Sequence, residues 1–260
     1  MSISGSGLSF TGDATSYLRV SYGGGLELGT SDFTIEWYQY QTDSNPYPRI
    51  FQIGYYDATI VIGVSIESGQ FYYWRNNVAT PVKYLTASEY KNQYVHFAIC
   101  RSGTTTKIFM NGSLIYTDTV GSVTDFVNGS YDLVISNEYT PSDEAAFGGY
   151  IKYFSWVKGN AYYSEDFTVS SSAPTYTITE GFLLTESGVT GSLSDNIDIE
   201  SGSFTFVEDT PTTSTSAVSD YSRMRRPLYT NNSLVFYKSS SLAPGGVGGV
   251  SNSRIKSRRT

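Results

Sequence analysis

The sequence predicts an all-β protein, a sandwich or jelly roll of short antiparallel strands with an extended C-terminal arm. Aromatic residues make up 15% of the 260-residue chain and are accompanied by 25 Gly, a composition that favours strands and tight turns. Strand patterns separated by turn residues recur between residues 7 and 190 at the spacing typical of a sandwich. No helical period persists for three turns. These three observations together argue against an all-helical bundle.

The individual strands are predicted from alternation and from two-residue turns. Residues 33–38 alternate Phe, Ile and Trp with Thr, Glu and Tyr, the period of a half-buried strand. Ser68-Gly69, Ser102-Gly103 and Asn111-Gly112 each predict a hairpin, because glycine accepts a positive φ without a Cβ clash. Further strands are expected at residues 131–136, 150–157 and 181–185.

Composition divides the chain into three parts. Residues 1–190 are expected to form the sandwich. Residues 191–222 are polar and rich in Ser and Thr; they contain a predicted hairpin of residues 197–200 and 204–207, followed by a linker with too little apolar surface to offset the entropy of ordering. Residues 223–260 form a basic, Gly/Ser-rich arm.

The arm and the body carry opposite charges. Residues 1–222 hold nine basic and all 24 acidic side chains, a net charge of −15, whereas the arm has a net charge of +8. Such an arm is expected to anchor on another structural subunit of an assembly, or on nucleic acid without sequence specificity. A disordered solubilising tail is the alternative. The anchoring residues would be Arg223, Arg225, Arg226, Arg254, Lys256, Arg258 and Arg259.

Several classes of protein are argued against by what the chain lacks. No run of about 18 to 20 apolar residues is present, so no membrane insertion is expected. The N-terminus has neither a basic nor an apolar region typical of a secretory signal. Cys100 and His96 are each the only residue of their kind, which rules out an internal disulfide and a two-histidine metal site. Both are expected to be packing residues.

Strings spread over residues 5–187 carry a family resemblance. They include residues 7–10, 33–37, 49–54 and 64–69, and they are most specific at residues 94–112 and at 147–151 with Trp156. In this order they resemble the laminin-G-like, pentraxin-type branch of the concanavalin A-like lectin/glucanase superfamily. The resemblance implies a jelly roll of two antiparallel sheets, in which the first strand, near residues 9–10, pairs beside the last, near residues 182–184.

One more string bears on biological context. Residues 157–163, with 167–168 and Pro174, look like the version of this domain found in structural proteins of phages and large DNA viruses. The resemblance therefore implies a virion component of the minor capsid, decoration or fibre type, assembled in a host cell. An extracellular location is the alternative.

Hydrolysis is a rival function, because some members of the superfamily are endoglucanases with a Glu-Ile-Asp-Ile-Glu strand. The nearest string here is residues 196–200, Asn-Ile-Asp-Ile-Glu. Alternation places Asn196, Asp198 and Glu200 on one face, but an amide stands where the nucleophilic carboxylate would be needed. A solvated strand face is the better interpretation, and no catalytic residue is predicted.

Two kinds of binding site are also conceivable. Asn137, Asp143 and Glu144 could supply part of a calcium shell, although an acidic solvent-exposed loop is favoured over a metal site. Aromatic rings beside amides and charges could bind a sugar or a protein; the candidates are Tyr55, Tyr56, Asp57, Tyr72, Tyr73, Trp74, Arg75, Asn76 and Asn77.

The sequence thus predicts a non-enzymatic structural or interaction protein, lectin-like in fold and anchored in a virus particle by its basic arm. A free carbohydrate-binding lectin is the first alternative, and a glycoside hydrolase the second. Because this architecture serves all three roles, the fold alone does not choose among them.

Overall fold

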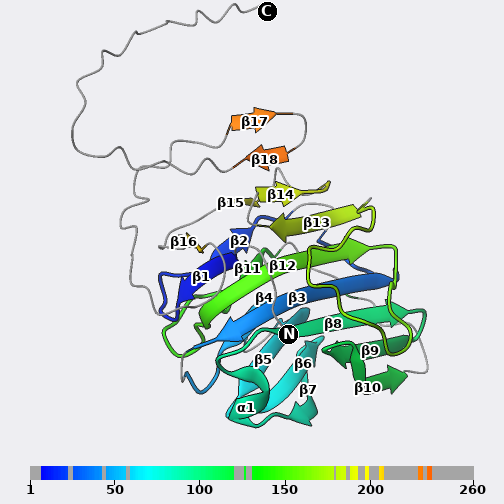
Figure 1. The fold of residues 1–260 in the computed structure, drawn as a ribbon, viewed down its shortest axis with the longest axis horizontal. Coiled ribbons are helices and arrows are strands. Elements are labelled where there is room, and N and C mark those ends of the chain that lie inside the picture. Colours follow the sequence, from blue (N-terminus) through cyan, green and yellow to red (C-terminus); the bar gives the residue numbers. More distant parts are fainter. Residues whose placement is uncertain are drawn as a thin grey trace, which may run out of the picture.

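Two antiparallel sheets pack face to face (Figure 1). The computed structural model describes residues 7–22, 26–42, 45–56, 59–119, 126, 131–178, 180–185, 188–192, 197–198, 205–207, 228–230 and 233–235. Apart from a single helical turn, α1 (Ala87–Tyr90), the regular elements in these ranges are strands. The predicted all-β jelly-roll sandwich is therefore confirmed.

The larger sheet has eleven described strands, nine of them in one continuous order. That order is β10 (Ser113–Thr119), β9 (Thr105–Met110), β8 (Val95–Ser102), β3 (Phe33–Gln41), β12 (Gly148–Lys158), β13 (Glu180–Thr185), β14 (Gly188–Thr190), β18 (Ser233–Val235) and β17 (Leu228–Thr230). Beside β12 lie the other two, β1 (Gly7–Thr11) and, beyond it, β16 (Thr205–Val207).

The smaller sheet has seven described strands and faces the first across the core. Their order is β15 (Ile197–Asp198), β2 (Leu18–Val20), β11 (Leu133–Ile135), β4 (Arg49–Ile53), β5 (Ile62–Glu67), β6 (Gln70–Arg75) and β7 (Val78–Tyr84). In Figure 1 this sheet lies behind the larger one.

The hairpins predicted at Ser68-Gly69, Ser102-Gly103 and Asn111-Gly112 are confirmed, and their turns show why these residues were needed. Ser68 and Gly69 both have positive φ, 49° and 88°, between β5 and β6. A Cβ on Gly69 would lie 2.7 Å from the carbonyl oxygen of Leu85, so only glycine fits. Asn76 and Asn77 make the next turn with φ of 43° and 65°. Positive φ at both central residues matches the twist of a tight hairpin.

Two of the predicted strand pairings were wrong. β1 does not pair with β13: both pair with β12, β1 along residues 148–151 and β13 along residues 154–158. Since β3 occupies the other edge of β12, the two short strands follow one another along a single edge. β15 and β16 likewise form no hairpin, because β15 pairs with β2 in the smaller sheet and β16 with β1 in the larger.

Aromatic residues dominate the core between the sheets. Trp37 of β3 packs edge-on against Phe51 and stacks on Phe97, each with ring centroids 5.5 Å apart. Phe154 and Trp156 of β12 extend the same cluster toward Phe51. This explains the high aromatic content, since large rings from both sheets fill the interior with few voids.

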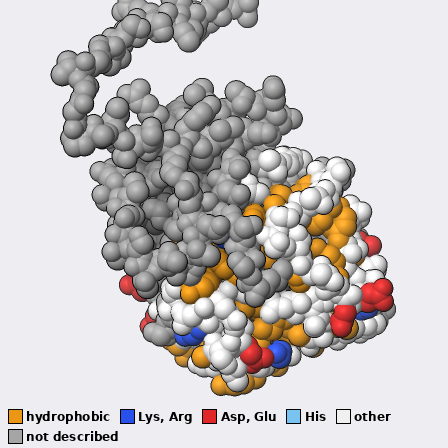
Figure 2. All heavy atoms as spheres, in the orientation of Figure 1, with side chains coloured by type: hydrophobic (Ala, Val, Ile, Leu, Met, Phe, Trp, Pro, Cys, Tyr) orange, Lys and Arg blue, Asp and Glu red, His pale blue; other side chains and the backbone are white. Residues whose placement is uncertain are grey.

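The prediction that β3 is half-buried was wrong, because β3 is buried on both faces except at Tyr40. Residues 159–178, here called the cover segment, run without regular structure across the outer face of the larger sheet. Figure 2 looks onto this covered face, where hydrophobic side chains alternate with polar surface and charged groups lie mostly toward the rim. A strand pattern of period two cannot reveal an irregular segment that covers its polar side.

Only two short parts of the C-terminal arm are described. β17 and β18 form a hairpin whose Leu234 and Val235 pair with Val189 and Gly188 of β14. This stretch therefore extends the chain's own sheet, whereas the arm was predicted to be held by a partner. The seven predicted anchoring residues lie outside the described residues. Among the described elements, no helix is long and apolar enough to cross a bilayer.

Candidate functional site

Among the described residues, side chains overlie the outer face of the smaller sheet, and Gln52, Ser65 and Val134 on it are buried. Cross-strand register places Arg19, Val134, Gln52, Gly63 and Trp74 side by side, from β2 across β11, β4 and β5 to β6. Their neighbours in sequence, such as Ile62, Leu133 and Tyr73, point into the core. Gly63 has no side chain, so the ring of Trp74 meets no bulky neighbour on β5.

Six aromatic rings gather on this face, here called the aromatic belt: Tyr55, Tyr56, Tyr72, Trp74, Tyr131 and Tyr139. Tyr56 meets Trp74 edge-on with centroids 5.7 Å apart, and Tyr72 lies 6.4 Å from Trp74. Tyr55 contacts Tyr139 at 4.5 Å and Tyr131 at 5.7 Å. Tyr55 and Tyr56 are each 46% exposed, so the belt presents ring surface to solvent.

Arg49 holds the Trp74 end of the belt in place. Its guanidinium lies 4.8 Å from the centroid of Tyr56 and 5.1 Å from that of Trp74, distances at which a cation is attracted to a ring face. Arg49 also pairs with Glu67. Ser65 links Trp74 to Glu67. Its hydroxyl accepts a hydrogen bond from Trp74 Nε1 at 3.0 Å and donates one to Glu67 at 2.8 Å.

Arg19 holds the Tyr139 end of the belt in place. Its guanidinium lies 5.0 Å from the Tyr139 centroid, donates to the Tyr139 carbonyl at 3.0 Å and pairs with Asp132 at 3.4 Å. The loop after β11 is thereby held back over the sheet. Each end of the belt thus rests on an arginine that is already paired with a carboxylate.

The sequence predicted part of this surface. Tyr55, Tyr56 and Trp74 lie in it, whereas Tyr73 is fully buried in the core, because alternate residues of β6 face opposite sides. Arg75 pairs with Asp118 of β10, and Asn76 belongs to the β6–β7 turn, so neither joins the belt. Asp57 lies outside the described residues.

Sequence reasoning identified Tyr72 but missed Arg49, Arg19, Tyr131 and Tyr139 as members of the site. The sequence did contain a signal for Arg49, because Arg49 begins the strand that ends just before Tyr55 and Tyr56. Tyr139 had no comparable signal, because its place depends on how the loop after β11 folds back.

A separate cluster of buried polar side chains lies beneath the cover segment. Glu36 is 1% exposed, and its two oxygens meet Tyr176 OH at 2.7 Å and His96 Nε2 at 3.2 Å. Tyr176 also shares a 2.7 Å hydrogen bond with Ser155. Burial, followed by the charge of Glu36, raises the pKa of Tyr176 well above its usual value, so this phenol remains a donor.

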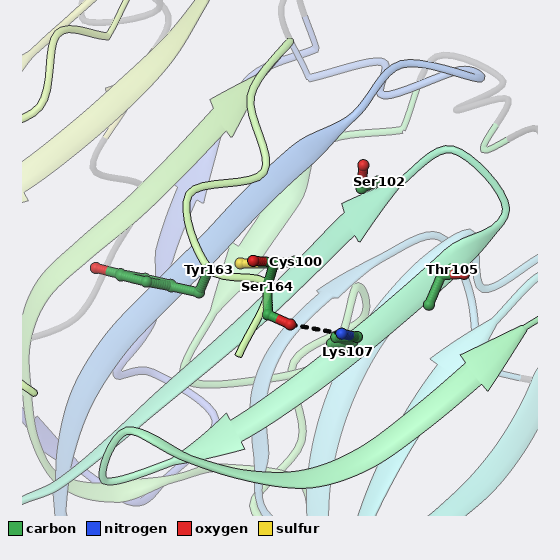
Figure 3. A pocket seen from close by; sticks show the side chains of 6 residues that line it. All are labelled: Cys100, Ser102, Thr105, Lys107, Tyr163 and Ser164. Atoms are coloured by element: carbon green, nitrogen blue, oxygen red, sulfur yellow. Dashed lines mark hydrogen bonds between the residues drawn. The ribbon is translucent and has the colours of Figure 1, made fainter. Parts of the chain in front are cut away.

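A cavity of about 250 Å³ opens beside the cover segment (Figure 3). It is lined by Cys100, Ser102, Thr105, Lys107, Tyr163 and Ser164. Burial raises the pKa of the Cys100 thiol to about 12, which suppresses the thiolate that nucleophilic chemistry requires. His96 lies four residues away along β8, roughly 13 Å by strand rise, and pairs with Glu36. The two do not form a catalytic dyad, in accord with their expected packing roles.

The residues predicted to bind calcium organise their own loop. Asn137 Oδ1 accepts the backbone N–H groups of Glu138 and Ser142 at 2.8 and 3.1 Å, and Asp143 accepts the Ala14 N–H at 2.7 Å. In the ranges the structure describes, no three His, Cys, Asp or Glu side chains gather as they would to hold a metal ion. Calcium binding at Asn137, Asp143 and Glu144 stays a prediction.

The fold is a two-sheet β-sandwich with a group of aromatic side chains on the outer face of its smaller sheet. The family described as the concanavalin A-like lectin/glucanases superfamily, a laminin G-type domain, matches residues 12–170. Because the match spans more than half of the chain, the chain belongs to this family, and the predicted resemblance is confirmed at that level.

Solved structures share the fold. A proposed carbohydrate-binding protein from Bacteroides ovatus ATCC 8483 aligns with a TM-score of 0.55 at 14% identity, over 80% of this chain and 60% of the other. The extracellular region of zebrafish Gpr126/Adgrg6 aligns at 0.51 and 14%, over 78% and 27%. Mouse laminin α1 domains LG4-5 align at 0.46 and 15%, over 66% and 49%.

These similarities are limited in two ways. At such low identity the alignments with TM-scores of 0.55 and 0.51 show the fold alone, and no argument rests on the laminin alignment. The chain spans less than two thirds of the length of each of these proteins. Among curated proteins, no sequence matches the chain.

Proposed function

We propose that the protein binds carbohydrate through the aromatic belt. The observation that carries this proposal is the pair of half-exposed tyrosines, Tyr55 and Tyr56, set beside Trp74 on an arginine scaffold. Sugars offer apolar C–H faces and hydroxyl edges. Aromatic residues with a polar tip, held rigidly next to fixed polar groups, suit such a ligand. Membership of a family that contains lectins supports this reading, which was the first alternative from the sequence.

Binding rather than catalysis is proposed for two reasons. The thiol of Cys100 is held protonated, and the buried carboxylate of Glu36 lies beneath the cover segment. Of the glucanase-like string, only the backbone of Ile197 and Asp198 is described, as β15 at the edge of the smaller sheet. Turnover of a β-glucan that is lost in Glu200→Gln would restore the hydrolase alternative.

The test is a glycan array probed with the full chain, followed by titration calorimetry on the best ligand. Trp74→Ala and Tyr56→Ala are each expected to weaken binding at least tenfold, since central aromatic residues carry most of the energy of a binding surface. Tyr84→Ala is the matched control, because Tyr84 is 66% exposed on β7 but lies outside the belt. Silence on a broad array, or equal losses in all three variants, would contradict the proposal.

Calcium is tested in the same assay. Belt binding is expected to survive a chelator, because the belt consists of aromatic rings and arginine–carboxylate pairs. Loss of binding in the chelator, restored by Ca²⁺ and abolished in Asp143→Asn, would instead place a required calcium ion in the loop of Asn137, Asp143 and Glu144.

A second candidate role, as a structural subunit of a virus particle, is supported by the charge difference between body and arm. Here the arm would anchor the chain to a neighbouring subunit while the belt remains exposed. Deleting residues 223–260 is expected to release the protein from the particle without unfolding the sandwich. Continued incorporation of the shortened chain would refute this role and leave carbohydrate binding untouched.

A further inference from the structure

The electrostatics of the aromatic belt restrict the class of sugar it can accept. Both belt arginines already have partners: Arg49 pairs with Glu67, their side chains being 4% and 20% exposed, and Arg19 pairs with Asp132 at 12% and 25%. An acidic sugar would have to compete with these carboxylates for the same guanidinium groups. It would also approach Glu67 and Asp132 themselves, and like charges brought together at an interface are strongly disfavoured.

The charge of the whole body acts in the same direction. Residues 1–222 carry a net charge of −15, and a field of this sign lowers the local concentration of anions. The local pairs and the overall field therefore both select against sialylated, sulfated or uronic sugars.

The shape of the belt gives a second restriction. It runs from Trp74 and Tyr72 on β6, past Tyr56 and Tyr55 after β4, to Tyr139 above Arg19 on β2. Between β6 and β2 lie four strand spacings of about 4.8 Å, so the belt is roughly 19 Å long. A single ring covers only part of that length, whereas an oligosaccharide can contact rings at both ends.

We propose that the ligand of the aromatic belt is a neutral, extended oligosaccharide that lies across the strands of the smaller sheet. This inference rests on the proposed function and narrows it to a substrate class. The ion pairs Arg49–Glu67 and Arg19–Asp132 exclude anionic sugars, and the two ends of the belt bind different units of the same chain.

Two series of probes test the inference on the full-length protein. The first pairs neutral oligosaccharides with their acidic counterparts, such as lactose with sialyllactose and xylo-oligosaccharides with their glucuronylated forms. The second extends each neutral backbone from one to six units. Neutral probes are expected to bind at least tenfold more tightly than acidic ones, and affinity is expected to rise over several units.

A charge variant provides the sharper readout. Glu67→Gln removes the partner of Arg49 and is expected to reduce the preference for neutral sugars at least threefold. Asp132→Asn removes the partner of Arg19, with the same expected effect on the preference, and replaces Glu67→Gln in the test if that variant fails to fold. Glu180→Gln is the matched control, because it frees Lys158 from an ion pair on the larger sheet and should leave the preference unchanged.

The outcomes separate this inference from the proposal beneath it. Equal or tighter binding of acidic probes would overturn the neutral preference while leaving carbohydrate binding intact. A monosaccharide that binds as tightly as its hexamer would overturn the extended site. Absence of binding to every probe would overturn the proposed function itself.

Discussion

Tyr176→Phe tests whether the cover segment is held by the buried carboxylate of Glu36. The substitution removes one hydroxyl and keeps the ring, so the stacking of Tyr176 on Tyr162, at 4.1 Å between centroids, is retained. What is lost is the 2.7 Å hydrogen bond to Glu36 and the 2.7 Å bond shared with Ser155.

The expected cost follows from the burial of Glu36. Its side chain is almost inaccessible to water, so water cannot readily replace the lost donor. A hydrogen bond to a charged group contributes about 1.5–3 kcal/mol, and the free energy of unfolding is expected to fall by that amount. For a protein of this size, each kcal/mol corresponds to roughly 2–4 °C in Tm.

The measurement is urea denaturation followed by tryptophan fluorescence, with calorimetry for Tm. Tyr162→Phe is the control, because its hydroxyl donates only to the exposed carbonyl of Thr177 and its loss should cost less than about 0.5 kcal/mol, in keeping with a surface substitution. If Tyr176→Phe is as stable as Tyr162→Phe, Glu36 does not hold the cover segment and the reasoning is refuted.

Three further predictions concern single residues. Gly112→Ala should destabilise the fold by about 3 kcal/mol or more, because φ is +81° and a Cβ would lie 2.0 Å from the Phe167 carbonyl oxygen. Gly103→Ala, at φ +55° in open space, should cost only about 1–2 kcal/mol. Equal losses of unfolding free energy in urea denaturation would contradict this prediction. Cys100 should react with a thiol reagent at pH 8 only after unfolding, since burial raises the pKa of its thiol to about 12; rapid labelling of the native protein would show the cavity to be open to it. The pKa of Glu89 is lowered from 4.5 to about 2, chiefly by its hydrogen bond to Lys83. The stability that this carboxylate contributes is therefore present above about pH 4.5 and is lost as the pH falls toward 2. An NMR titration that gives Glu89 an ordinary pKa would be inconsistent with the pairing.

Local signals in the sequence were sufficient for the hairpins at Ser68-Gly69, Ser102-Gly103 and Asn111-Gly112. Turn residues such as Asn111 and Gly112 act within four residues of chain, so their effect is visible without tertiary structure. Pairings made over long distances were less accessible. β1 and β13 share one edge of β12 only because β12 is eleven residues long and its other edge is taken, a fact that no short window contains.

The candidate site was predictable to the same extent. Tyr56 and Trp74 stood out as aromatic residues next to turns. The burial of Tyr73 could have been derived from strict alternation along β6, once Tyr72 and Trp74 were placed outside. The position of Tyr139 could not be derived, because a contact made by a loop with Arg19 depends on the register of three strands.

The two outer faces of the sandwich both carry aromatic side chains, and their ring contacts differ in geometry. In the cover segment the rings stack face to face: Tyr163 lies 3.7 Å from Phe167 at 6°, and Tyr162 lies parallel to Tyr176. A stacked ring has one face occupied by its partner, and the sheet lies beneath the pair. In the belt the contacts are steep, 62° between Tyr56 and Trp74 and 89° between Tyr55 and Tyr131. An edge-on contact occupies the rim of one ring and one face of the other, whereas a stacked contact occupies one face of both rings. The belt rings therefore keep more of their faces free than the stacked rings of the cover segment, as the proposed carbohydrate binding requires.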